Sequence, residues 1–408
     1  MKYRFRQLVA AALLGAAIAV VTTACGGDDP TATPKPTNTP APVATATATP
    51  APGVTVVPPT ATPVPAATPT PSFDAEAYFK GKTIRLMVGY NPGGGTDAQA
   101  RFMSRGLAPF IPGKPRIIVT NLTPNITQRN YVWNAKPDGF TFSLEATAGI
   151  YAMAEDIAQF DLREVGVIGV TSGKDAIWMI RGTMPYNCGP DAFGSTGPKL
   201  ITGTSAPTPS ELGSSIAYAW FADLKGIPLQ IRNLAAAGSA EQYIMIERGD
   251  TNSWYTSTLW GQMPKKRPGW VESGFIRGFM DMSFPGYTLD GNVEQPVFPC
   301  PTVDSVLETE EQKAFWTAMN GPRTFSSKAL HGPPNMDPNV LGALRDALSA
   351  AMNDPEYVAS MESFTGIKSR FSPGDVAQKE LIDTVNAYLE MKGEIDKVQQ
   401  TVFDKFVY

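Results

Sequence analysis

Short apolar runs alternate along the chain with stretches in which apolar residues recur at helical spacing. Runs rich in β-branched residues predict strands, whereas recurrence every three or four positions predicts helices. From residue 73 onward, strands are predicted at 83–89, 116–120, 140–144, 165–171 and 176–180, and helices at 98–107 and 128–134. This strand–helix rhythm favours a mostly parallel sheet covered by helices.

The rhythm restarts after a segment rich in proline and glycine at residues 183–198. Strands are then predicted at 199–203, 229–234 and 253–259, and helices at 210–224 and 239–247. We expect a strand at 275–282 to return to the first unit, and a helical tail to follow, in which Asp337 caps a helix and Pro338 occupies its first turn.

These patterns predict an α/β protein of two lobes, each a mixed, mostly parallel sheet flanked by helices. Lobe 1 is expected to comprise residues 73–182 and 283–408, and lobe 2 residues 183–282. Proteins with two such lobes usually bind their ligand in the cleft, at the carboxyl ends of the strands.

The first 25 residues have the pattern of an export signal. A basic start is followed by an uncharged apolar stretch at 8–21 and then by Ala24 and Cys25. The apolar stretch is shorter than the roughly 20 residues of a membrane span, so the pattern is typical of a secretory signal. We expect residues 1–24 to be removed and Cys25 to carry a lipid; ordinary cleavage, for example after Ala19, is the alternative.

Residues 26–72 consist almost entirely of proline, threonine and alanine, with Lys35 as the only charge between Pro30 and Ser72. Such a composition buries little apolar surface and predicts an extended tether. Residues 25–72 are therefore expected to form a lipid anchor and tether. The folded part is expected to be extracytoplasmic, anchored to the bacterial cell membrane through its N-terminus.

Charge and histidine content narrow the classes of function. The formal net charge is −4 with no basic stripe, which argues against a nucleic-acid partner. His331 is the only histidine, so the sequence offers no metal-ligand spacing, and no cofactor or metal is expected. We expect no enzyme activity; a hydrolase with a pair of carboxylates is one alternative, and a surface lipoprotein with a sensing or adhesive role is another.

Cys188 and Cys300 are the only cysteines beyond the anchor. An oxidising compartment permits them to pair. Two isolated buried thiols are the alternative, and the spacing of the two residues does not decide between them.

The most informative segment is the glycine loop, residues 90–97 (YNPGGGTD), between the first predicted strand and helix. Its three glycines allow backbone N–H groups to approach a ligand, and the positive end of the following helix favours an anion. Asp97 is expected to cap that helix, and direct contact with the ligand is an alternative that can coexist with capping. Nucleotide binding is disfavoured, because Asn121 stands near where a dinucleotide site needs an acid and no P-loop lysine follows.

The glycine loop alone is too weak a site. A helix terminus stabilises an anion by about 0.3–1 kcal/mol, and by up to about 2 when partly buried, whereas micromolar affinity needs about 8 kcal/mol. A second surface should therefore close over the ligand. The candidates are turns at Thr204–Ser205 and Gly238–Ser239, for which ordinary turn chemistry is the alternative, together with Thr147, and Trp254, for which core packing is the alternative.

Several motifs resemble the solute receptors of tripartite tricarboxylate transporters, the Bug-like family. They are Lys82–Ile84, the glycine loop, Arg101 and residues 136–142 (KPDGFTF), with weaker similarity at 201–205, 301–302 and 353–355. The resemblance covers residues 73–408. It implies a type II periplasmic-binding-protein-like fold that closes over a small carboxylated solute and delivers it to a membrane permease, as a monomer without a cofactor.

The resemblance also implies the residues that hold the ligand. On this chain they are Tyr90, Asn91, Gly93, Gly94, Gly95, Thr96, Asp97, Thr204, Ser205, Gly238 and Ser239. One turn departs from the family pattern, because residues 121–125 (NLTPN) contain no glycine where the family has a turn rich in proline and glycine. We therefore expect a divergent member with a different ligand.

Overall fold

The computed structural model describes residues 73–145, 149–171, 176–204, 209–234, 239–256, 267–283, 300–325, 328–365 and 369–407. The signal peptide, Cys25 and the tether lie outside the described residues, as do Thr147, Ser205 and Gly238. Among the described residues, no helix is both long enough and apolar enough to span a membrane.

The first lobe is built on a six-stranded sheet with the order β11-β4-β10-β3-β1-β2. Strands β1 (Thr83–Val88), β2 (Arg116–Asn121) and β3 (Thr141–Glu145) are parallel. Strand β10 (Ala329–Pro334) runs antiparallel between β3 and β4 (Val165–Val170), and β11 (Ser372–Pro373) continues the sheet beyond β4. The sheet is thus mixed.

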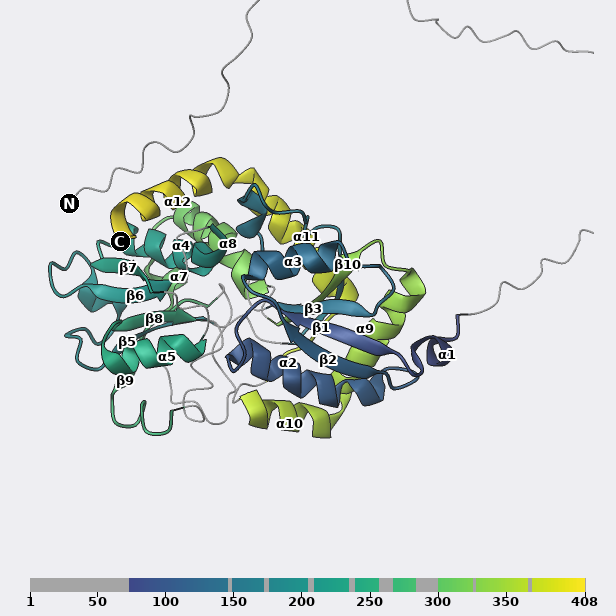
Figure 1. Ribbon diagram of the computed structural model, residues 1–408. Helices are drawn as coiled ribbons and strands as arrows, with labels where there is room; N and C mark the ends of the chain where they lie inside the picture. Colours follow the sequence, from purple (N-terminus) through teal and green to yellow (C-terminus); the bar gives the residue numbers. More distant parts are fainter. Residues whose placement is uncertain are drawn as a thin grey trace, which may run out of the picture. The chain divides into compact units, whose positions relative to one another are not determined.

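Helices cover both faces of this sheet (Figure 1). One face packs on α2 (Gly95–Gly106) and α9 (Pro338–Asn353), with α10 (Pro355–Thr365) against these two helices, and its core includes Ile84 and Leu86 of β1. The other face packs on α3 (Asn125–Trp133) and α11 (Gly374–Glu390). The short elements α1 (Ala75–Phe79), η1 (Ala108–Phe110) and η2 (Ala152–Ala154) complete this part of the chain.

The second lobe contains two smaller sheets. Strands β6 (Leu200–Thr204) and β7 (Leu229–Asn233) are parallel and connected by α4 (Pro209–Leu224). Strand β5 (Ile177–Arg181) lies between β8 (Ser253–Thr256) and β9 (Ile276–Asp281), antiparallel to both. Helix α5 (Ser239–Arg248) precedes β8, and η3 (Gly189–Ala192) follows β5.

Two strand assignments from the sequence need correction. The strand at 275–282 was expected to return to the first unit, but β9 pairs with β5 in the second. The strand at 176–180, which was expected in lobe 1, likewise does not join the large sheet, since β4 pairs with β10 and β11 and β5 pairs with β8 and β9. Both strands are almost entirely buried, and a strand buried on both faces fits either sheet equally well by its sequence.

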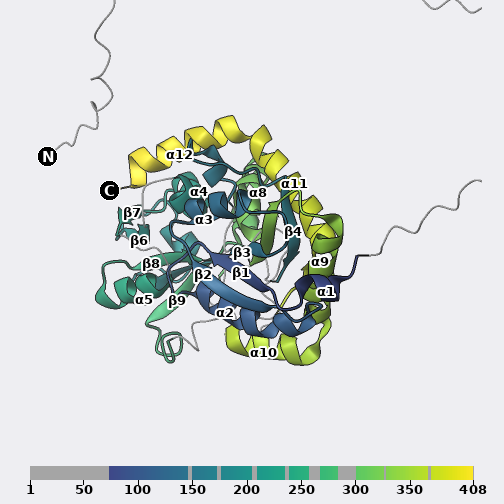
Figure 2. The ribbon, with the colours of Figure 1, turned by 45° about the vertical axis from the view of Figure 1, so that its right-hand side comes forward.

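The C-terminal helices link the two groups of sheets. Helices α7 (Val303–Val306) and α8 (Glu310–Phe325) precede β10, and α12 (Lys392–Phe406) follows α11. Figure 2 shows α11 and α12 following one another along one side. Helix α11 packs on β4, whereas α12 packs on α4 and β7, where Val407 forms a parallel bridge to Ile231.

A single apolar cluster extends across both groups of sheets. It includes Val167 of β4, Trp178 of β5, Phe221 of α4, Trp316 of α8 and Tyr388 of α11, all of which are almost completely buried. Because this core is shared, the limits 73–182 with 283–408 and 183–282 remain a prediction.

Cys188 and Cys300 form a disulfide, with 5.4 Å between their Cα atoms. The bond joins the start of η3 to the segment that leads into α7. The alternative of two isolated thiols is therefore wrong.

Candidate functional site

Three parallel strands of the large sheet end at the same edge. Val88 of β1 lies in register with Asn121 of β2, and β3 runs parallel beside β1. Helices α2 and α3 begin just beyond this edge, so both present their N-terminal ends there. Gly89 permits the close packing, because a Cβ on it would lie 2.7 Å from the Cα of Asn125.

The glycine loop enters α2 through Gly94, the N-cap residue, which offers no side chain to the helix end. Asp97 in the first turn bonds to the loop instead, since its Oδ2 accepts a hydrogen bond from the N–H of Gly93 at 2.9 Å. Gly93 has φ +85°, a conformation that favours glycine. Gly94 is thus the cap of α2, and the expected capping role of Asp97 is wrong, because its carboxylate instead holds the residue before the cap.

Asp97 is also the centre of a network that fixes the loop. Arg101 donates to both carboxylate oxygens, at 3.0 and 2.9 Å, and Asn121 donates to Oδ1 at 2.9 Å. Burial alone would raise the pKa of Asp97, but the bonds from Arg101, Gly93 and Asn121 hold it below its usual value. Asp97 is 2% exposed, and the carboxylate acts here as a support for the loop.

Asn121 gives the glycine-free turn a defined role. Its amide nitrogen donates to the carbonyl oxygen of Tyr90 at 2.9 Å as well as to Asp97, and its oxygen accepts from Arg101. The side chain of Asn121 thus holds both ends of the glycine loop. Sequence reasoning noted this residue as the absence of an acid and as part of a glycine-free turn, and predicted no contact for its side chain.

Lys328 is the residue that sequence reasoning missed altogether. Its side chain is nearly inaccessible at 2% exposure, and its Nζ donates to Oγ1 of Thr96 at 2.9 Å. A buried ammonium group costs several kcal/mol in desolvation, and here it lies beside the positive end of α2. Lys328 thus adds to the positive potential at the start of α2.

A second buried ionic cluster lies between β3, β10 and α3. Arg129 forms an ion pair with Glu145 at 3.0 Å, and Ser143 and Gln128 donate to the same carboxylate at 2.6 and 3.2 Å. Burial alone would raise the pKa of Glu145. The charge of Arg129, with a smaller effect of His331, outweighs burial and holds this pKa below its usual value. Burial also lowers the pKa of His331 to about 4, against an upward pull from Glu145.

Among the described residues, one hydrogen bond joins the second lobe to the glycine loop. Asn91 of the glycine loop donates to Oε1 of Glu241, in the first turn of α5, at 3.2 Å. Thr204 ends β6 in register with Asn233 of β7 and is buried. Ser239 is the first residue of α5, the helix that Asn91 contacts.

Trp254 takes the alternative role of core packing. It is 9% exposed and belongs to a small apolar cluster with Met179 and Ile246. Its ring meets Tyr243 edge-on, with 5.8 Å between ring centroids. The structure thus places Trp254 among core side chains and does not bring it to the glycine loop.

Comparison with known proteins finds similar solved structures but no match by sequence. No family model matches the sequence, and no curated protein matches it. Among the described residues, no cluster of three or more histidine, cysteine or acidic side chains could hold a metal ion.

Solved structures are similar over most of the chain. The periplasmic binding protein BugD matches with a TM-score of 0.57 and 14% identity, covering 77% of this chain and 98% of its own. MatC from Rhodopseudomonas palustris, with bound malate, matches at 0.54 and 14%, covering 78% and 99%. A further R. palustris protein, with adipate, matches at 0.53 and 16%, covering 78% and 97%. The chain therefore has the two-lobed α/β fold of periplasmic solute-binding proteins.

Proposed function

We propose that this chain is a divergent solute receptor of the Bug-like family, which captures a small carboxylated solute between its lobes and delivers it to a membrane permease. The observation that carries the proposal is the first turn of α2, where the glycine loop meets a buried lysine hydrogen-bonded to Thr96. The fold shared with structures that hold malate and adipate supports it.

In this proposal the solute carboxylate lies against the glycine loop. The first N–H groups of a helix have no acceptor inside the helix, so they are available to an anion. Residues 90–97 would form one side of the site, and Thr204, Ser205, Gly238 and Ser239 the other, with Thr147 at the end of β3. The Lys328 charge adds the attraction that a helix end alone lacks.

The rest of the assignment follows from the N-terminal sequence pattern. Removal of residues 1–24, lipidation of Cys25 and a tether up to residue 72 would hold a monomeric receptor outside the cytoplasm, close to its permease. The chain would bind and release its solute chemically unchanged, without a cofactor.

A thermal-shift screen tests the ligand class. The mature protein is heated with mono-, di- and tricarboxylates, including malate and adipate, and with aromatic acids, a sugar and a neutral amide. We expect a carboxylate to raise the melting temperature, because a ligand at about 100 times its Kd stabilises by about 2.7 kcal/mol. Stabilisation by the sugar or the amide, with no response to any carboxylate, would contradict the proposal.

The substitution Gly94→Val tests the position of the site. The backbone at Gly94 has φ −73° and ψ 169°, which valine adopts without strain, so we expect the protein to fold and carboxylate binding to be lost. Gly393→Val at the start of α12, where the surrounding space is open, is the matched control. Unchanged affinity in the Gly94 variant would move the site elsewhere.

A further inference from the structure

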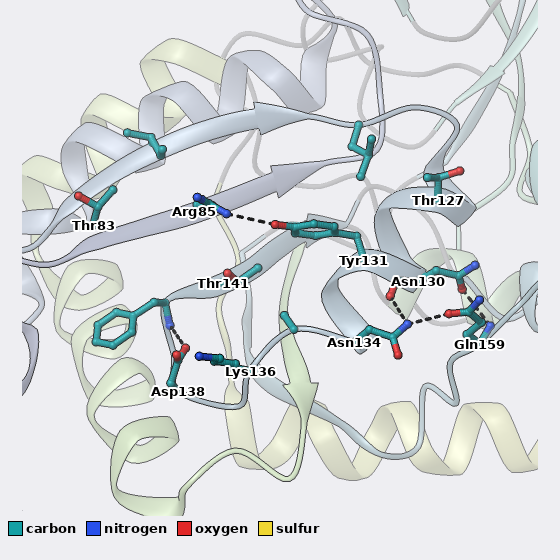
Figure 3. Close-up of a pocket in the computed structure, with 14 residues that line it drawn as sticks. Thr83, Arg85, Thr127, Asn130, Tyr131, Asn134, Lys136, Asp138, Thr141 and Gln159 are labelled. Atoms are coloured by element: carbon teal, nitrogen blue, oxygen red, sulfur yellow. Dashed lines mark hydrogen bonds between the residues drawn. The ribbon is translucent and has the colours of Figure 1, made fainter.

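A groove of the first lobe is lined from β1, β3, α3 and the segments that follow β2 and α3, and it shares no lining residue with the glycine loop (Figure 3). It has a volume of about 810 Å³, and Thr83 and Arg85 of β1, Ile118 of β2 and Thr141 of β3 line it from the large sheet. Helix α3 has nine residues and packs near the carboxyl ends of β1 and β3, so the starts of these strands remain uncovered on this face. The sequence matches this exposure, because Thr83 and Arg85 alternate with buried Ile84 and Leu86.

The groove carries positive charge on a polar floor. Arg85 lies in register with Thr141 on one side and Ile118 on the other, and Arg116 lies in register with Thr83. Lys136 lines the opposite wall. In the part of the chain that the structure describes, no carboxylate forms an ion pair with Arg85 or Lys136.

The remaining polar groups hold the groove in shape. Arg85 donates to the Tyr131 hydroxyl at 3.2 Å, and Asn134 donates to Gln159 at 2.7 Å. Asp138 is the only acid in the lining, and one of its oxygens accepts the N–H of Phe140 at 3.0 Å. Tyr131 is 40% exposed, so an aromatic ring and a guanidinium group stand together on an open surface.

The openness of these side chains argues against a small solute. Solute pockets enclose most of their ligand, whereas Thr83, Arg85, Tyr131, Asn134 and Lys136 are all exposed. An exposed ion pair contributes about 0–1 kcal/mol, so a free carboxylate would bind only weakly. Exposed tyrosine and arginine side chains are instead typical of protein interfaces.

We propose that this groove binds an extended acidic segment of a partner protein. The chain carries a net charge of −4, so the molecule as a whole repels an acidic segment. The positive side chains of the groove attract such a segment and direct it to this place. Arg85 would pair with one carboxylate and Lys136 with a second, while Tyr131 packs on the segment. The groove is independent of the solute site, and β1 and α3 border both.

The test uses a fluorescent dodecapeptide of alternating glutamate and glycine as the probe. We expect saturable binding in fluorescence anisotropy, about tenfold weaker in Arg85→Glu and in Lys136→Glu, and weaker still in high salt. Lys397→Glu on α12 makes the same change of charge elsewhere and should leave binding unchanged. A water-soluble carbodiimide should couple the peptide to Lys136, as read by mass spectrometry.

Three outcomes would overturn the proposal. The first is the absence of saturable binding, and the second is equal binding by the Arg85 variant and the Lys397 control. The third is displacement of the peptide by free glutarate at a similar concentration, because that result would indicate a site for small anions. Carboxylate binding at the glycine loop is measured separately by thermal shift, so the failure of one proposal leaves the other standing.

Discussion

At the scale of single residues, the site depends on side chains that hold other groups in place. Asp97, Asn121 and Arg101 form one network around the glycine loop, and Lys328 lies below it. Only the loop itself could be predicted from sequence. Lys328 and Thr96 are 232 positions apart, and Lys328 directly precedes β10, the strand that re-enters the large sheet after the second lobe.

Replacement of Lys328 by methionine should weaken carboxylate binding without unfolding the protein. A charge several ångströms from a carboxylate contributes about 1–3 kcal/mol at an effective dielectric constant near 20. We therefore expect affinity to fall about ten- to hundredfold in calorimetric titration. The free protein loses the hydrogen bond from Lys328 to Thr96, so its stability is measured alongside by urea unfolding. Equal affinity in Lys328→Met and in Lys397→Met would make Lys328 purely structural.

The buried His331 should make stability depend on pH. Its pKa is about 4 in the folded protein and about 6.5 when unfolded, so the unfolded chain binds the extra proton between these values. Stability should therefore be full above pH 6.5 and fall towards pH 4, by about 3 kcal/mol at most. Glu145, whose folded pKa is lowered, loses its contribution at still lower pH. Urea unfolding across this range should show a shallower dependence in His331→Gln; an identical slope would exclude His331 as the cause.

At the scale of elements, periodicity predicted most strands and helices but not every strand's partner. The helices at 210–224 and 239–247 appear as α4 and α5, with bounds that differ by a residue at one end. The error lay in β5 and β9, whose buried faces look alike in sequence whichever sheet they join. Trp254 shows the same limit, because an aromatic residue on a short strand fits a cleft wall or a core equally well.

The disulfide should matter to stability because it closes a long loop. Its cysteines are 112 positions apart, and cross-links of this span restrict the unfolded chain strongly. We expect the double variant Cys188→Ser, Cys300→Ser to lose about 2–4 kcal/mol in urea unfolding. Wild-type protein unfolded with a reductant should behave like the variant. If reduction leaves the wild-type midpoint unchanged, the cross-link is not a source of stability.

At the scale of the whole molecule, two lobes share one core. Trp316 of α8 lies 6.3 Å from both Trp220 and Phe221 of α4 between ring centroids, in the cluster that also contains Val167 of the large sheet. Motion between the lobes must therefore preserve this packing, and bending is confined to segments outside it.

The shared core predicts that residues 73–408 unfold in one step. Calorimetry of the folded part should give equal calorimetric and van't Hoff enthalpies, as a two-state transition requires. A carboxylate ligand should shift the whole transition and not a part of it. Two resolved transitions, only one of which responds to the ligand, would show that the lobes unfold separately.

The bridge between Val407 and Ile231 has a consequence for the order of folding. Strand β7 lies in the middle of the chain and pairs with β6. Its other neighbour is Val407, the residue that follows α12, which bridges to Ile231. A nascent chain that has emerged as far as α5 therefore holds β6 and β7 with one edge bare and α4 uncovered. The second lobe can reach its final form only after residues 392–407 have emerged, so its folding is post-translational although most of it is made early.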